Sequence, residues 1–168
     1  MIKENLIQLI DYTSLNNKES EESVSKFLDN LSRLDVNPAA VCTYSSFQNL
    51  LTPFLSSTTI KSCVVACSFP HGNQSQESKI QELQLLNSSQ IDEVDIVLPY
   101  EALSDLNKAV DELRQLRKSI SNKTFKVIIE SGHLSNSEIH KATQICLQSD
   151  IDFVKTSTGK IDIGATLN

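Results

Sequence analysis

The residues with the clearest chemical potential lie in the segment Asp152–Lys160, which reads DFVKTSTGK. Lys155 follows two apolar residues in a short strand-like run, and small polar residues follow it at once. A lysine in a buried strand loses hydration, which lowers its pKa and favours the uncharged amine. Because an uncharged amine on a rigid element is the nucleophile of Schiff-base enzymes, Lys155 is predicted to attack a carbonyl carbon.

Charged side chains also interrupt other apolar runs. Asp95 is flanked by valine and isoleucine, so a catalytic carboxylate is favoured over a purely structural partner for a buried lysine. Lys126 could equally begin its strand in solvent, and Asp11 could equally cap the turn that follows it.

The cysteines and histidines predict no metal site. Cys42 and Cys67 fit small core residues better than nucleophiles, and the spacing of the four cysteines matches no zinc template. His71 is expected in a loop that shapes the mouth of a site, whereas His133 and His140 are expected on the surface. We therefore expect free thiols in a reducing compartment, and neither a metal nor another cofactor.

The composition fits one domain over residues 1–168. Apolar residues make up 39% of the chain and charged residues 21%, as is usual for a globular protein. The formal net charge of −6 disfavours binding to nucleic acid or to an anionic membrane, since both attract a basic face. The polar start of the chain and the shortness of its apolar runs predict a cytoplasmic protein.

The elements that must position these residues are strands and helices in alternation. The predicted strands are Leu6–Asp11, Ala39–Tyr44, Lys61–Ser68, Val94–Leu98, Phe125–Glu130 and Phe153–Thr156. The predicted helices are Ser20–Leu34, Gln76–Leu86, Tyr100–Ile120 and Ser135–Leu147, and Phe47–Ser57 fits neither pattern clearly. Alternation without a Gly-rich first turn predicts an α/β fold of the TIM (β/α)8-barrel type, with about six of the eight strands in this chain.

Side-chain alternation along the strands groups the charged residues on particular faces. The outward faces of barrel strands pack against helices and should be apolar. The charged faces are therefore expected to point inward. They carry Asp11, Asp95, Lys126 and Lys155.

Six motifs in order resemble the deoxyribose-phosphate aldolases, a family of class I (Schiff-base) aldolases. They are Ile10–Asn16 (IDYTSLN), Pro38–Tyr44 (PAAVCTY), Phe69–Gly72 (FPHG), Val94–Tyr100 (VDIVLPY), Lys126–Gly132 (KVIIESG) and Asp152–Lys160. The resemblance implies reversible cleavage of 2-deoxy-D-ribose 5-phosphate to D-glyceraldehyde 3-phosphate and acetaldehyde, without a metal. It also implies a place in deoxyribonucleotide and carbohydrate catabolism.

By motif position, the resemblance implies roles for individual residues. Lys155 would form the Schiff base, and Asp95 would belong to the proton relay that acts on the carbinolamine and the enamine. The residues implied to bind substrate are Asp11, Thr13, Cys42, Lys126, Thr158, Gly159 and Lys160. The chemistry agrees with these roles, because an iminium is an electron sink and a carboxylate acting through water can take and return a proton.

The family pattern continues beyond the last motif of this chain. It has a seventh strand with a Gly-Phe-Lys-Pro-type motif, whose lysine assists the first, and a Gly- and Ser-rich eighth strand for phosphate. Neither occurs before Asn168, so the sequence predicts a domain without its C-terminal quarter. Lys126 or Lys160 would then have to supply the second positive charge.

Two hypotheses follow for this chain. The first is an aldolase that acts on a small phosphorylated sugar, and the second is an inactive remnant or interaction module of the same fold. A different Schiff-base aldolase is disfavoured by the six motifs. Because the outer strands would leave open edges, we expect a homo-oligomer or completion by a second chain.

Overall fold

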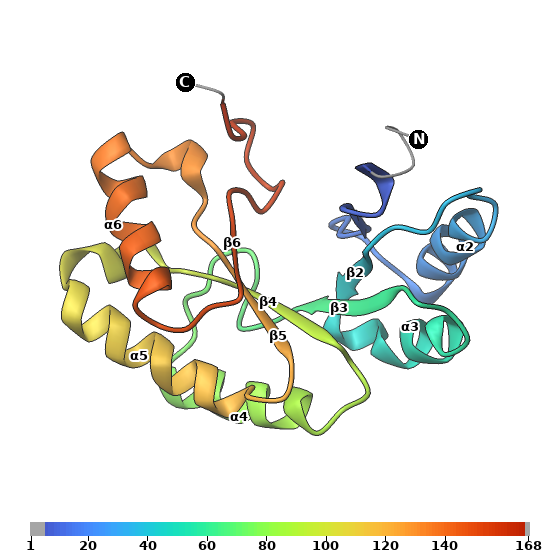
Figure 1. Cartoon of the computed structure of the whole chain (residues 1–168), viewed down its shortest axis with the longest axis horizontal. Helices are drawn as coiled ribbons and strands as arrows, with labels where there is room; N and C mark the ends of the chain where they lie inside the picture. The colour runs from blue at the N-terminus through green and yellow to red at the C-terminus, as the bar shows by residue number, and fades with distance from the viewer. Residues whose placement is uncertain (1–5, 167–168) are drawn as a thin grey trace. The chain divides into compact units, whose positions relative to one another are not determined.

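The computed structural model of the chain describes residues 6–166, in which strands and helices alternate (Figure 1). The chain divides into two units, described here one at a time. The first unit comprises residues 1–65 and 90–93, and the second comprises residues 66–89 and 94–168. The single domain predicted over residues 1–168 stays a prediction.

The first unit contains three parallel strands in the order β1–β2–β3. They are β1 (Asp11–Thr13), β2 (Ala40–Tyr44) and β3 (Lys61–Val65). Its helices are α2 (Glu21–Leu31) and α3 (Gln48–Leu55), and a 3-10 turn at Ser45–Phe47 leads into α3. Strands β2 and β3 are almost wholly buried, as is expected where parallel strands are covered on both faces.

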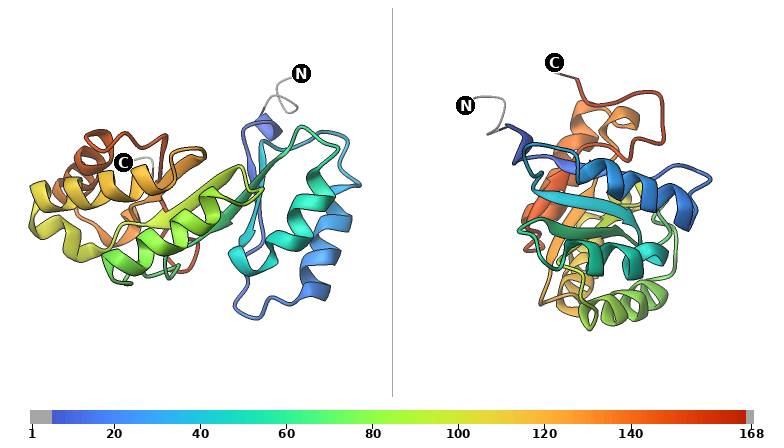
Figure 2. Two further views of the ribbon diagram at one scale, coloured as in Figure 1. Left: turned by 90° about the horizontal axis from the view of Figure 1, so that it is seen from below. Right: turned by 90° about the vertical axis from the view of Figure 1, so that its right-hand side faces the viewer.

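The second unit contains three strands in the order β4–β5–β6. They are β4 (Glu93–Val97), β5 (Thr124–Ile128) and β6 (Phe153–Lys155). Its helices are α4 (Gln76–Asn87), α5 (Leu106–Ser119) and α6 (Asn136–Leu147), with 3-10 helices η2 (Tyr100–Ser104) and η3 (Ser131–His133). Helix α5 lies between α4 and α6 (Figure 1), and Figure 2 shows α4 (green) and α5 (yellow) side by side.

Six strands in sequence order, with a helix after each of the first five, confirm the predicted fold class, a TIM (β/α)8-barrel type with six strands within the described residues. No helix among residues 6–166 is long and apolar enough to cross a bilayer.

The predicted first strand, Leu6–Asp11, is wrong. The backbone N–H groups of Leu9 and Ile10 donate to the carbonyls of Leu6 and Ile7 at 3.0 Å, so residues 6–10 form a helical turn. Strand β1 begins at Asp11, and it contains the predicted site residues Asp11 and Thr13. An apolar run this short has no periodicity that separates a strand from a turn of helix.

The other strand ends are set by backbone conformation. Strand β3 ends at Val65 and β5 at Ile128, because Cys67 (φ 59°), Ser68 (φ 60°) and Glu130 (φ 49°) adopt left-handed conformations that a strand excludes. Cys67 therefore lies beyond β3 instead of within the predicted strand Lys61–Ser68.

Local caps explain where the helices begin. The predicted helix Tyr100–Ile120 is divided, because the Asp105 carboxylate accepts from the Lys108 N–H and starts α5 at Leu106. A capping box of Ser135 and Glu138 starts α6, in agreement with the predicted helix Ser135–Leu147.

Candidate active site

The second unit brings together the two residues predicted to carry the chemistry. The Nζ of Lys155, at the end of β6, donates to Oδ2 of Asp95, in β4, at 2.5 Å. The Nζ of Lys126, in β5, lies 3.6 Å from Oδ1 of the same carboxylate. The side chain of Asp95 is 0% exposed, that of Lys126 is 5% exposed and that of Lys155 is 28% exposed. One buried carboxylate therefore links two amines, of which Lys155 is the more accessible.

The register of β5 and β6 explains this convergence. Ile128 lies opposite Lys155, and Lys126 lies two residues before Ile128 on the same face of β5. Lys126 therefore lies on the same face of the sheet as Lys155, two residues before the position opposite Lys155. Its burial excludes the alternative that Lys126 begins its strand in solvent.

The electrostatics of the group are asymmetric. A fully buried carboxylate is strongly unfavourable unless cations and hydrogen bonds compensate it, and Lys155 and Lys126 both do so. The carboxylate oxygens are divided between the two amines, since Lys155 contacts Oδ2 and Lys126 lies near Oδ1.

A polar loop follows Lys155 and is tied to the end of β5. The Glu130 carboxylate accepts the Thr158 N–H at 3.2 Å and 3.3 Å, and it also accepts the Thr158 hydroxyl. The Thr158 Oγ1 in turn accepts the N–H of Lys160 at 3.1 Å. Gly159, at φ 71°, occupies a left-handed conformation that suits glycine.

Glu130 is a site residue that sequence reasoning missed. It belongs to the motif Lys126–Gly132, but no role was predicted for it. The available signal was its place as a carboxylate directly after an apolar strand, where barrel enzymes place functional side chains.

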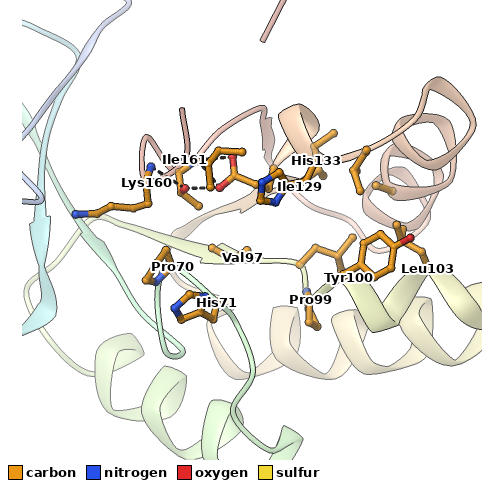
Figure 3. Close-up of a pocket in the computed structure, with 15 residues that line it drawn as sticks. Pro70, His71, Val97, Pro99, Tyr100, Leu103, Ile129, His133, Lys160 and Ile161 are labelled. Carbon is orange, nitrogen blue, oxygen red and sulfur yellow. Dashed lines mark hydrogen bonds between the residues drawn. The ribbon is translucent and has the colours of Figure 1, made fainter. Parts of the chain in front are cut away.

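A mainly apolar cavity of about 330 Å³ opens where β4, β5 and β6 end (Figure 3). Its polar lining residues are His71, Tyr100, Glu130, His133, Thr158 and Lys160. His71 reaches it because Gly72 (φ 63°) lets the loop approach β4, where a Cβ would lie 2.3 Å from the Val97 carbonyl oxygen. His133 was expected on the surface, and it is both exposed and part of the cavity wall.

The predicted site residues of the first unit lie on its first two strands. Thr13 is opposite Cys42 in the register of β1 and β2, and the Thr13 hydroxyl donates to the carbonyl of Asp11 at 2.9 Å. Glu19 stabilises the turn after β1. Its carboxylate accepts the backbone N–H of Asn16 at 3.1 Å and the side-chain amide of Asn16 at 2.7 Å. Where Asp11, Thr13 and Cys42 lie relative to Lys155 stays a prediction.

The four cysteines are free and buried. Burial, with a contribution from the Glu82 carboxylate, raises the pKa of Cys67 to about 12, and burial likewise raises the pKa of Cys146 to about 12. Thiols of such high pKa are poor nucleophiles near neutral pH, which agrees with their interpretation as core residues.

Comparison with known proteins gives the same fold. No protein-family model matches the sequence. A Coccidioides immitis protein assigned as a deoxyribose-phosphate aldolase is 24% identical, with a TM-score of 0.88 over 97% of this chain and 64% of its own. QR15, an aldolase, is 29% identical, with a TM-score of 0.85 over 97% of this chain and 72% of its own.

The deoxyribose-phosphate aldolase of Aeropyrum pernix, described as having a unique tetrameric structure, is 24% identical. It matches with a TM-score of 0.80 over 94% of this chain and 66% of its own. This chain thus spans about two thirds of the length of the structures that it matches. Over nearly all of its residues it has the fold of the deoxyribose-phosphate aldolases and resembles that family.

Proposed function

We propose that this chain provides the Schiff-base site of a deoxyribose-phosphate aldolase. The reaction is the reversible cleavage of 2-deoxy-D-ribose 5-phosphate to D-glyceraldehyde 3-phosphate and acetaldehyde. The observation that carries the proposal is the 2.5 Å contact between the accessible amine of Lys155 and the buried carboxylate of Asp95. The order of the strand-end motifs and the similarity to solved aldolases support it.

The proposed reaction begins when the neutral amine of Lys155 attacks C1 of the open-chain sugar. The carbinolamine loses water and becomes an iminium. A base removes the C3 hydroxyl proton, the C2–C3 bond breaks, and its electron pair moves into the iminium to form an enamine. Glyceraldehyde 3-phosphate leaves, C2 of the enamine takes up a proton, and water releases acetaldehyde from Lys155.

Asp95 and Lys126 have separate parts in this proposal. The Asp95 carboxylate transfers protons to and from the reacting atoms through an intervening water. Lys126 places a second positive charge beside the same carboxylate and so favours proton loss from Lys155. Thr158, Gly159 and Lys160 bind the oxygen-rich part of the substrate.

The remaining proposals concern the first unit and the setting of the enzyme. Substrate binding by Asp11, Thr13 and Cys42 stays a prediction. The expected cytoplasmic location, the catabolic role and the association with further copies or a second chain stay predictions.

Borohydride trapping tests the proposal. The purified chain is incubated with acetaldehyde and reduced, and the adduct is located by intact mass and peptide mapping. We expect one adduct on Lys155, its loss in Lys155→Ala, and its retention in Lys141→Ala, which removes an exposed lysine of α6. An adduct that survives Lys155→Ala would show that the Schiff-base assignment is wrong.

The second candidate is a binding module of the same fold. It is favoured by the exposed apolar side chains of β6, where Phe153 is 59% and Val154 is 40% exposed. A folded chain that forms no adduct with acetaldehyde would support this candidate.

A further inference from the structure

Glu130 holds the loop after Lys155 through several contacts at once. Its carboxylate accepts both the N–H and the hydroxyl of Thr158, which is 8% exposed. The Thr158 hydroxyl oxygen accepts the backbone N–H of Lys160, so the hydrogen bonds that begin at Glu130 extend to Lys160. Hydrogen bonds to an ionised acceptor are stronger than those between neutral groups, and this part-buried set therefore orders residues 158–160.

Lys155 itself is held by other groups. Its carbonyl oxygen accepts the N–H of Ile129 at 2.9 Å in the strand ladder, and its amine is bound to Asp95. These bonds of Lys155 run to Ile129 and Asp95, whereas those of Thr158 run to Glu130.

The backbone of Glu130 adopts a conformation that a glycine would adopt with less strain. Its φ of 49° and ψ of 56° are left-handed, a conformation that costs a residue other than glycine or asparagine on the order of 1 kcal/mol. Glycine would be the more stable choice at this position if the backbone alone mattered. The carboxylate that faces Thr158 is what a glycine could not supply.

We propose that Glu130 is a positioning residue, which holds Thr158 and Lys160 in the geometry that receives the oxygen-rich part of the sugar phosphate. The proposal rests on the proposed function of Lys155. It assigns Glu130 to substrate binding and leaves Schiff-base formation to Lys155 and Asp95. Acetaldehyde, which lacks the sugar phosphate portion, therefore reacts with Lys155 independently of Glu130.

Two variants, Glu130→Gly and Glu130→Asn, test substrate binding separately from Schiff-base formation. Glycine and asparagine are chosen because both tolerate the left-handed backbone at this position. We expect the rate of acetaldehyde trapping on Lys155 to stay within about twofold of wild type. The half-saturating concentration of 2-deoxy-D-ribose 5-phosphate should rise by roughly tenfold or more. The matched control is Asp150→Gly, since Asp150 is also left-handed (φ 57°) but exposed in another loop, and it should change neither quantity.

Amide hydrogen exchange gives a readout that does not depend on activity. The Thr158 and Lys160 amides should exchange roughly tenfold faster or more in both Glu130 variants than in wild type or Asp150→Gly. Unchanged exchange overturns the positioning role. An equal loss of acetaldehyde and sugar phosphate reactivity also overturns it, because Glu130 would then support the whole site. Wild-type protein that traps no acetaldehyde contradicts the proposed function instead, and the exchange rates still decide whether Glu130 orders the loop.

Discussion

A buried charge is tolerated where neighbouring groups compensate it, and the second unit shows two such cases. Asp95 is compensated directly by two amines within 3.6 Å. Lys79, in α4, is 6% exposed, and burial lowers its pKa, which Cys67, Glu112 and Glu101 partly raise again. The first arrangement is part of the proposed chemistry, whereas Lys79 has no place in it.

We therefore expect Lys79→Met to stabilise the protein by about 1 kcal/mol at neutral pH, because methionine fills similar space without a buried charge. The pKa of Lys79 is lower in the folded than in the unfolded state, so folding is opposed below the folded-state pKa. This penalty disappears as the pH rises to the unfolded value of about 10.4. Urea unfolding at pH 7 and pH 10 should show the advantage of the variant shrinking.

Lys26→Met is the matched control for this prediction. Lys26 is an exposed residue of α2, so its replacement should change the free energy of unfolding by less than about 0.5 kcal/mol at either pH. An advantage of Lys79→Met that does not depend on pH would mean that improved packing, not charge burial, is the cause.

Among the elements, α6 shows how a local signal supports the site. The Ser135 hydroxyl accepts the N–H of Glu138, and the Glu138 carboxylate accepts the N–H of Ser135 at 2.8 Å. The same carboxylate accepts the Tyr100 hydroxyl at 2.6 Å, and the hydrogen bonds from Tyr100 and Ser135 lower the pKa of Glu138 to about 2. The cap thereby connects the start of α6 to η2, beside the cavity.

Ser135→Ala should destabilise the protein by about 1 kcal/mol, because the cap then leaves an N–H of the first turn without its acceptor. Urea unfolding followed by circular dichroism measures the loss. Ser137→Ala, in the same exposed turn but without a capping bond, is the control and should have little effect. Equal effects of the two substitutions would argue against the cap.

At the scale of the molecule, β6 is the last strand of the second unit and pairs with β5 in the described residues. It exposes Phe153 and Val154, and Ile163 beyond it is 57% exposed. Exposed strand edges with apolar side chains promote association between chains.

We expect the sedimentation coefficient of the chain to rise with concentration, and Phe153→Lys to reduce that rise, because a lysine on the edge disfavours strand pairing. Leu147→Lys is the control, since Leu147 is 73% exposed at the end of α6 instead of on the strand edge. A wild-type chain that sediments as a monomer at all concentrations would contradict the prediction.

The general fold could be predicted because its signals are local. Period-2 runs and amphipathic segments identify the strands and helices, and Ser135 with Glu138 marks the start of α6. The predicted ends of strands and helices were wrong where a single backbone conformation or a single cap decided them. Glu130 ends β5 by adopting a left-handed conformation, and Asp105 starts α5, although neither residue type requires that behaviour.

The sequence by itself predicted Lys155 and Asp95 as site residues, because a charge within an apolar strand is unusual wherever the strand lies. Their contact, across 60 residues of chain, was decided by the tertiary structure, since strand order and register bring β4 and β6 to Lys126. The bond from Glu130 to Thr158 also depends on tertiary structure. It requires a left-handed backbone at one strand end and a loop from another, and no local pattern specifies that combination.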